Sequence, residues 1–377
     1  MKKKLCIIAS APSGIVAFWR TNIEKLASQF DIYVVANFSD SSFFDGLQIK
    51  GCKSINIERR PSVMSSLKAV NELKRYFKQE RFDGFISMSS NASLVAAIAG
   101  WLVGVPFRAR IFTGQVWANK TGMSRVFFKT IDKLTVALNN HILVDGRPQQ
   151  RYLVENGILR DGQSTVLANG SICGVDVNKF CPSDIIRQKE REKLHLGNDD
   201  VVFTFMGRIN RDKGTYELLA AFNQLCAEKE HARLLLIGNS EGITNDTFSS
   251  YPNIRLSENL ICYGYAQKPY EALQAGDVFC LPSYREGFGM SAIEAASVGL
   301  SVICSDAYGL GDSYVDGVTG LKCKVKDVET LYLAMKKLYE NPEMRASFGK
   351  AGRERILEKF TKEMVSSAWL EYFVNNL

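Results

Sequence analysis

Short apolar runs alternate with segments of helical periodicity along almost the whole chain, and this alternation restricts the possible folds more than any other feature of the sequence. Because two parallel strands need a long connection, usually a helix, such alternation is typical of parallel-sheet α/β domains. In the first half, strands are predicted at residues 5–9, 31–36, 54–58, 83–88, 108–112, 141–144 and 166–168. In the second half, they are predicted at residues 201–206, 233–237, 261–263, 278–281 and 301–304.

Segments with apolar residues at helical spacing lie between these strands. Helices are predicted at residues 16–29, 61–81, 91–102, 126–138, 184–194, 215–228, 289–297, 327–339, 342–359 and 362–375. A chain of 377 residues is too long for one ordinary core, so two domains are expected. The predicted organisation is an N-terminal domain at 1–168, a turn-rich crossover linker at 169–180, a second domain at 181–357, and a C-terminal helix within 358–377 that packs back on the first domain.

Composition favours a globular protein of the reducing cytosol. The hydrophobic content is 46% and the charged content 23%. No apolar run approaches the roughly 18 residues of a membrane-spanning helix. The apolar stretch at residues 5–9 is shorter than the roughly 7–15 residues of an export signal, so we interpret it as a strand. The nine cysteines contain no Cys-x-x-Cys pair, which argues against a zinc site and a disulfide framework.

Positive charge is concentrated in the first half of the chain. Residues 1–180 contain 24 Lys and Arg against 13 Asp and Glu, whereas the remainder contains 23 against 27. The predicted helix at 61–81 has an apolar stripe with basic residues mostly off it. Two interpretations stay open for both features: an anionic partner such as a membrane surface, a lipid diphosphate or nucleic acid, or a solvated basic surface.

One stretch of the second half combines a strand, a glycine loop and a helix start. The strand at 278–281 ends at Pro282, the loop contains two glycines, and helix-forming residues follow Gly289. The unpaired N–H groups at a helix start favour an anion, typically a phosphate. Carboxylates occur before the loop at Glu286 and about one turn into the helix at Glu294. Both could face the same crevice.

A second glycine-containing turn follows the first strand of the same half. It begins at Gly207 and carries Arg208 and Lys213, whose charges suit a diphosphate. The alternative is a surface turn with incidental charge, but the glutamate loop in the same domain strengthens the functional interpretation. In the first half, the turn at residues 10–14 and the loop at 113–122 follow predicted strands, where open α/β sheets bind ligands.

This ordered set of motifs resembles the retaining glycosyltransferases of family 4. The resemblance rests on Gly207-Arg208, Lys213-Gly214, and the glutamates Glu286 and Glu294 with seven residues between them. It extends to Asn169-Gly170, Gly174-Val-Asp176, Phe180, Tyr263-Gly-Tyr265, Asp277, Pro282-Ser283 and Asp316-Gly-Val-Thr-Gly320, and so covers nearly the whole chain. It implies the GT-B fold, in which two Rossmann-like parallel-sheet domains face each other across a cleft.

The resemblance also implies roles for individual residues. Arg208 and Lys213 would hold the nucleotide diphosphate of the donor. Glu286 would contact the donor sugar, and Glu294 would bind the ribose hydroxyls. Further donor contacts are implied for Gly14, Gly207, Gly287, Phe288, Gly289 and Met290. Contacts on the acceptor side are implied for Ser13, Thr113, Gly114 and Gln115.

The chain departs from the family pattern after the predicted strand at 108–112. Many members have His-Gly there, whereas this chain has Thr113-Gly114, and its three histidines lie elsewhere. Hydrogen bonding to the donor sugar would then fall to Thr113 or Gln115. The run at 112–118 resembles members that extend lipid-linked oligosaccharides in bacterial surface polysaccharide assembly. The implied acceptor is a lipid-diphosphate-linked saccharide, used by a cytoplasmic enzyme at the inner face of the plasma membrane.

No Asp-x-Asp motif occurs, so no metal and no cofactor are expected. The resemblance implies transfer of a hexose or N-acetylhexosamine with retention, from uridine diphosphate as the family's commonest donor nucleotide. Two rivals remain: an epimerase or hydrolase of nucleotide sugars with the same fold, and a two-lobed sugar-binding protein without turnover. Nucleic-acid binding is the weakest hypothesis, because the basic residues are not interleaved with a stacking motif.

Overall fold

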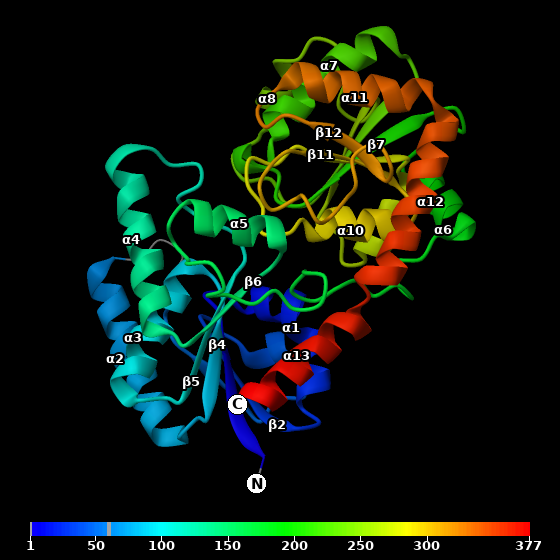
Figure 1. Cartoon of the computed structure of the whole chain (residues 1–377). Helices are drawn as coiled ribbons and strands as arrows, with labels where there is room; N and C mark the ends of the chain where they lie inside the picture. Colours follow the sequence, from blue (N-terminus) through cyan, green and yellow to red (C-terminus); the bar gives the residue numbers. More distant parts are fainter. Residues whose placement is uncertain (1, 59–61) are drawn as a thin grey trace. The chain divides into compact units, whose positions relative to one another are not determined.

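The computed structural model describes residues 2–58 and 62–377 (Figure 1). It divides into two compact units. The N-terminal unit comprises Met1–Gly174 and Lys362–Leu377, and the second unit comprises Val175–Thr361. Each contains one six-stranded sheet in which every strand pair is parallel. The expected pair of Rossmann-like domains is therefore present.

The sheet of the N-terminal unit has the strand order β3-β2-β1-β4-β5-β6. Its strands are β1 (Lys3–Ile8), β2 (Phe30–Ala36), β3 (Gly51–Ser54), β4 (Gly84–Ser87), β5 (Phe107–Phe112) and β6 (His141–Val144). Chain order reverses between β1 and β4. In open α/β sheets, the carboxyl ends of strands on either side of such a reversal flank the usual ligand crevice.

Helices cover both faces of this sheet. They are α1 (Pro12–Leu26), α2 (Val63–Glu80), α3 (Ser90–Val103), α4 (Gly122–Leu138), α5 (Arg147–Glu155) and α13 (Lys362–Asn376), with a 3₁₀ turn η1 (Ser41–Phe44). Side chains alternate along a strand, so Leu5 and Ile7 of β1 join the core under α1 and α13. Cys6 and Ile8 join the core under α2 and α3 on the opposite face.

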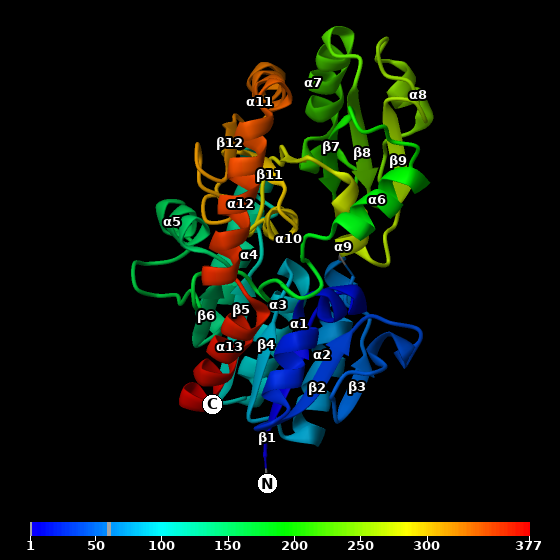
Figure 2. The same ribbon diagram turned by 90° about the vertical axis from the view of Figure 1, so that its right-hand side faces the viewer.

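The C-terminal helix α13 belongs to the N-terminal unit and lies alongside α1 (Figure 2). The ring of Trp369 lies 4.8 Å from that of Trp19, and both side chains are buried. The indole N–H of Trp369 also donates a hydrogen bond to the carbonyl of Ile172 at 2.9 Å. These contacts attach the end of the chain to its first helix.

The second unit repeats the doubly wound arrangement with the strand order β12-β11-β10-β7-β8-β9. Its strands are β7 (Val201–Met206), β8 (Ala232–Ile237), β9 (Leu260–Gly264), β10 (Val278–Leu281), β11 (Ser301–Ser305) and β12 (Gly320–Cys323). Its helices are α6 (Asp184–Lys193), α7 (Thr215–Glu228), α8 (Asn245–Ser249), α9 (Pro269–Ala272), α10 (Met290–Ser297), α11 (Val328–Glu340) and α12 (Pro342–Lys359), with 3₁₀ turns η2 (Arg211–Lys213) and η3 (Leu273–Ala275).

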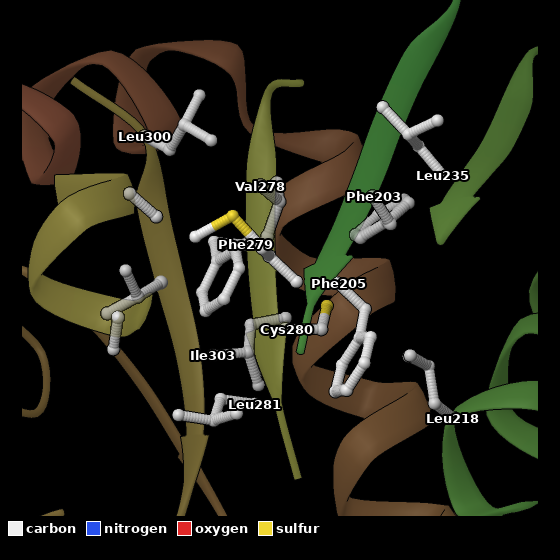
Figure 3. Packing of buried hydrophobic residues seen from close by; sticks show 14 of the residues in the cluster. Phe203, Phe205, Leu218, Leu235, Val278, Phe279, Cys280, Leu281, Leu300 and Ile303 are labelled. Atoms are coloured by element: carbon white, nitrogen blue, oxygen red, sulfur yellow. The ribbon is translucent and has the colours of Figure 1, made fainter. Parts of the chain in front are cut away.

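Two helix pairs sandwich this second sheet. Helices α7 and α11 pack together on one face, and α10 and α12 on the other (Figure 1). Figure 3 shows the core at its centre, where side chains of β7, β10 and β11 meet a residue of α7. Phe203, Phe279 and Leu218 are completely buried in it. This core holds the carboxyl ends of β7 and β10 in fixed positions.

Several predicted boundaries are wrong. The first helix begins at Pro12, not near residue 16, because proline is well suited to the first turn of a helix. The strand predicted at 54–58 lies at β3, because its partner β2 ends at Ala36, opposite Ser54. Residues 166–168 form no strand; only Thr165 bridges to β6, and Ala168 adopts a φ of 48°. Residue 61, at the predicted start of α2, lies outside the described residues.

Candidate active site

Two loops of the second unit leave the sheet at the point where its strand order reverses. Strands β7 and β10 are neighbours, with β8 and β9 on one side and β11 and β12 on the other. The loop at 207–214 follows β7, and the loop at 282–289 follows β10. Because the strands are parallel, both loops emerge at the same edge, which is the usual ligand position in such sheets.

The two loops are bonded directly to each other. The backbone N–H of Tyr284 donates to the carbonyl of Asp212 at 2.9 Å. The guanidinium of Arg285 contacts the carboxylate of Asp212, also at 2.9 Å. A Cβ atom at Gly214, where φ is 71°, would lie 2.0 Å from the carbonyl oxygen of Pro282. Glycine is therefore required at 214 for the loops to approach this closely.

Lys213 and Glu286, both predicted site residues, form an ion pair between these loops. The Lys213 Nζ lies 2.5 Å from Glu286 Oε1, and their side chains are 21% and 13% exposed. The hydroxyl of Ser283 donates to the same carboxylate oxygen at 2.7 Å. Ser283 is itself buried, and its carbonyl accepts a hydrogen bond from Ser305. The Glu286 carboxylate is thus held by a cation and a fixed hydroxyl.

Arg208, the other member of the predicted basic pair, has a different partner. Its guanidinium contacts Glu241 Oε2 at 2.9 Å, and both side chains are about half exposed. Asn210 donates to the same oxygen at 2.9 Å. The backbone of Gly207 packs closely against Gly238, because a Cβ atom at Gly238 would lie 1.9 Å from the carbonyl oxygen of Gly207. The basic pair is therefore divided between two carboxylates.

Helix α10 begins at the end of the second loop. Gly289 precedes its first residue, Met290, with a φ of 88°, and this glycine has no side chain with which to cap the helix start. A Cβ at Gly309 would lie 2.1 Å from the carbonyl of Glu286 and 2.7 Å from that of Gly287, so a third segment supports the loop. The side chain of Phe288 is buried against Phe360, so only its backbone is available to a ligand.

Glu294, in the second turn of α10, is partly exposed, and its carboxyl group has no hydrogen-bond or ion-pair partner among residues 2–58 and 62–377. The surrounding protein raises the pKa of its carboxyl group to about 8, because burial disfavours the charged form. At neutral pH this group is therefore mostly protonated. The two glutamates differ clearly: Glu286 is paired, whereas Glu294 keeps its hydrogen-bonding capacity.

Three residues of this edge had no predicted role. Glu241 lies in the loop after β8 and belongs to no sequence motif. Its place after a strand that neighbours β7 is a weak sequence signal for a site residue. Tyr284 donates its hydroxyl to Glu217 at 2.6 Å, and burial raises its pKa. Ser283 was part of a recognised motif, and the structure adds its bond to Glu286.

In the N-terminal unit, Ser13 and Gly14 lie in the first turn of α1. This turn follows β1, beside the reversal between β1 and β4. The hydroxyl groups of Ser10 and Ser89 lie 2.8 Å apart and join the segments after the two strands. Ser13 is exposed and Gly14 partly exposed. The predicted turn is thus a helix start at the expected edge.

Thr113, Gly114 and Gln115 follow β5, two strands from β1. Thr113 is partly exposed, whereas Gln115 is completely buried. The expectation that Gln115 offers its side chain to a ligand is therefore not supported by its position. The loop is anchored by Trp117, whose indole N–H donates to Asp132 at 2.7 Å.

A buried acid at the end of β6 was missed by sequence reasoning. The backbone N–H of Asp145 donates to the carbonyl of Phe112 at 3.3 Å, so its position is fixed beside the end of β5. Its side chain is 5% exposed, and its Oδ1 lacks a partner among the described residues. Burial raises the pKa of this carboxyl to about 8. Gln149, also buried, accepts a hydrogen bond from the Asp145 backbone at 3.2 Å.

Among the described residues, no group of three or more His, Cys, Asp or Glu side chains is arranged to hold a metal ion. None of the helices in the described part of the chain has the length and apolar character needed to cross a membrane.

The chain is similar in sequence to known glycosyltransferases. Residues 186–355, inside the second unit, match the family described as "Glycosyl transferases group 1". The capsular polysaccharide biosynthesis glycosyltransferase CapM of Staphylococcus aureus is 25% identical over 360 residues, covering 94% of this chain and 92% of that protein. The UDP-Gal:alpha-D-GlcNAc-diphosphoundecaprenol alpha-1,3-galactosyltransferase of Escherichia coli is 21% identical, covering 80% of this chain and 78% of that protein.

Solved structures share the fold over nearly the whole length. Sucrose-phosphate synthase from Thermosynechococcus elongatus superposes with a TM-score of 0.81 at 19% identity, covering 99% of both chains. HepE of Anabaena, in complex with UDP-glucose, superposes with a TM-score of 0.80 at 17% identity, again covering 99% of both chains. The fold is GT-B, and the family match in the second unit supports a glycosyltransferase.

Proposed function

We propose that the protein is a retaining glycosyltransferase of family 4. It transfers a hexose or N-acetylhexosamine from a UDP-sugar to a lipid-diphosphate-linked saccharide in cell-surface polysaccharide synthesis. The observation that carries the proposal is the Lys213–Glu286 pair at the reversal of the second sheet, beside the uncapped start of α10.

The donor half of the proposal follows from charge. A nucleotide diphosphate needs positive charge and N–H donors, and Lys213, Arg208 and the start of α10 supply both at one edge. Arg208 is about half exposed, so its ion pair with Glu241 costs little to break when a diphosphate offers stronger contacts. HepE of Anabaena was crystallised with UDP-glucose, which supports a UDP-sugar as the donor class.

The proposed roles of the glutamates follow from their different surroundings. Glu286 is held by Lys213 and Ser283, so its second oxygen is oriented for a hydroxyl of the donor sugar. Glu294 has no protein partner in the described part of the chain, and its carboxyl group accepts hydrogen bonds from the two ribose hydroxyls or, when protonated, donates one to them. Neither glutamate acts as a general base.

The proposed reaction proceeds on one face of the sugar. The bond between the anomeric carbon and the diphosphate oxygen breaks, and the acceptor hydroxyl forms its new bond from the same side. The acceptor's proton passes to the leaving phosphate oxygen, so atoms and charge balance without a base from the protein. Lys213 and Arg208 stabilise the negative charge that develops on the diphosphate. No metal ion is required in this scheme.

The acceptor and the cellular location are proposed from the relatives and from charge. The Escherichia coli relative acts, by its name, on a diphosphoundecaprenol-linked sugar, and CapM is named for capsular polysaccharide biosynthesis. The basic residues of the N-terminal half suit a lipid diphosphate and the anionic inner face of the plasma membrane. We propose that the protein works there as a peripheral enzyme on the cytoplasmic side.

A donor panel tests this function. UDP-, GDP- and ADP-sugars are incubated with the full chain, with and without a short-chain prenyl diphosphate saccharide, and released nucleotide diphosphate is measured. The expected result is release that depends on the acceptor and persists in EDTA. Donor conversion without acceptor would favour the epimerase or hydrolase, and donor binding without release would favour the sugar-binding protein.

A further inference from the structure

Helix α4 of the N-terminal unit exposes its apolar side to solvent. Met123 is 90% exposed, Val126 64%, Phe127 61% and Leu134 47%. Val126, Phe127 and Leu134 lie three, four and eleven residues after Met123, so all four side chains share one stripe of the helix. In an ordinary surface helix such a stripe faces the core. Here it is the outer face, and we call it the α4 stripe.

The orientation of α4 is fixed by the polar residues beneath it. Asp132, on the inner side, is buried and accepts hydrogen bonds from Arg110 at 2.6 Å and Trp117 at 2.7 Å. Thr135 and Val136 are buried on the same side. Rotating the helix to bury the α4 stripe would break this ion pair and leave a buried charge, which is strongly destabilising. The apolar stripe therefore faces outward as a stable feature.

The surroundings of the α4 stripe are basic. Between residues 84 and 140 of the sequence the only acidic residue is Asp132, whose charge is paired with that of Arg110. The basic residues of this segment are Arg108, Arg110, Lys120, Arg125, Lys129 and Lys133. Lys133 is exposed and borders the stripe. An apolar stripe bordered by positive charge, with no exposed acid in the same segment of the chain, complements an anionic lipid surface.

The location of the stripe suits the proposed acceptor. Met123, Val126 and Phe127 lie in the first turns of α4, which follows β5, so they lie toward the carboxyl edge of the sheet, as Thr113 does. Helix α2 also begins with exposed apolar residues, Val63 at 81% and Met64 at 64%. Helix α2 follows β3 of the same parallel sheet, and α3 packs against both α2 and α4.

We infer that the α4 stripe is a docking surface for an anionic phospholipid bilayer, in which Met123, Val126 and Phe127 enter the headgroup region while the neighbouring lysines contact lipid phosphates. This inference rests on the proposed function and deepens it by naming the surface that brings the enzyme to its lipid-linked acceptor. A second copy of the chain fits less well, because two copies would bring like charges together.

Vesicle sedimentation tests the docking surface. The full chain is mixed with vesicles of phosphatidylglycerol and phosphatidylcholine, or of phosphatidylcholine alone, at low and high salt. We expect binding to the anionic vesicles that weakens with salt. The double variant M123S/F127S should lose at least tenfold in partitioning, and K133E several-fold. The matched control is Ile185→Ser, because Ile185 is 83% exposed in the second unit, and it should bind as wild type.

Three results would overturn the inference: no binding of the wild-type chain to anionic vesicles, unchanged binding of the double variant, or a wild-type dimer in solution that M123S/F127S makes monomeric. Turnover of a short-chain, vesicle-free acceptor separates this inference from the proposed function. If M123S/F127S binds vesicles like wild type while turnover is normal, the docking surface is wrong and the function stands. If wild type binds through the stripe but never transfers sugar, the proposed function fails alone.

Discussion

Lys213 Nζ lies 2.5 Å from Glu286 Oε1, so the loops after β7 and β10 meet through the two charged groups that the sequence motifs singled out. The lysine charge is directed at the carboxylate of Glu286. A bound diphosphate would compete for that charge, while Ser283 would keep its hydrogen bond to Glu286. The ion pair therefore positions both side chains at the candidate site, and the lysine can exchange the carboxylate for a diphosphate.

Replacing Lys213 with alanine should lower kcat by about 10²- to 10³-fold, because the charge on the leaving diphosphate loses its nearest cation. Stability should fall by about 1–3 kcal/mol, because the pair is mostly buried and the Glu286 oxygen that faced Lys213 keeps only its hydrogen bond from Ser283. Steady-state kinetics and urea unfolding measure the two effects. The control is Lys229→Ala, because Lys229 is 25% exposed and pairs with Glu340 at 2.8 Å in the same unit. Equal turnover in both variants would refute the role of Lys213.

Replacing Gly214 with alanine should destabilise the second unit. Two effects add: the positive φ costs about 1–2 kcal/mol, and the clash of the new Cβ with the Pro282 carbonyl costs about 1–3 kcal/mol more. Gly317→Ala isolates the first effect, because Gly317 has a φ of 74° and a Cβ added there would have no atom within 4 Å among the described residues. Urea unfolding followed by circular dichroism gives both values. A Gly214→Ala variant no less stable than Gly317→Ala would show that the loops can separate cheaply.

Most of the elements that form the candidate site in the second unit were predictable from sequence, because its strands are apolar runs that end abruptly at small residues. The loops after β7 and β10 and the start of α10 were found in this way. The pairing of Arg208 with Glu241 was not, because Glu241 lies in the loop after β8 without any motif. Strand β12 was missed for a related reason: Gly320–Cys323 has only four residues and includes a glycine and a lysine, and its pairing with β11 defines it.

The orientation of α4 could not be obtained from periodicity alone. A stripe of apolar residues predicts which residues share a face, but not whether that face is buried. The deciding residue is Asp132, which needs both Arg110 and Trp117 from other segments. Likewise, the burial of Gln115 and Asp145 depends on how the ends of β5 and β6 are covered, which one strand's sequence does not reveal.

Replacing Asp145 with asparagine should reduce the loss of stability that accompanies a rise in pH from about 4 to about 8. The pKa of this carboxyl is about 8 in the folded protein, well above the value near 4 in an unfolded chain. Folding therefore takes up a proton between these pH values, and stability falls as pH rises through them, by up to about 1.4 kcal/mol per pH unit. Asparagine has nearly the same shape as the protonated aspartic acid side chain but does not titrate.

Urea unfolding at pH 5 and pH 8 measures this effect. The wild-type chain should lose clearly more free energy of unfolding between these conditions than Asp145→Asn. Asp40→Asn is the control, because Asp40 is exposed and its hydrogen bonds to Ser42 lower its pKa, which gives the opposite sign. Parallel pH profiles of wild type and Asp145→Asn would contradict the burial argument.

Glu294 connects pH to donor binding, if it holds the ribose as proposed. Burial raises the pKa of its carboxyl group to about 8, so this group is mostly protonated at neutral pH. The ionised form accepts hydrogen bonds from both ribose hydroxyls, whereas the protonated form accepts fewer. The KM for the donor should therefore fall as pH rises from 7 to 9.

Glu294→Gln should show a higher KM above pH 8 and no such dependence, because its amide does not titrate. Glu294→Ala should raise the KM at every pH, since it removes the acceptor entirely. Donor KM values measured for the three proteins across this range decide the question: a Glu294→Gln profile that still falls with pH would assign the titration to another group.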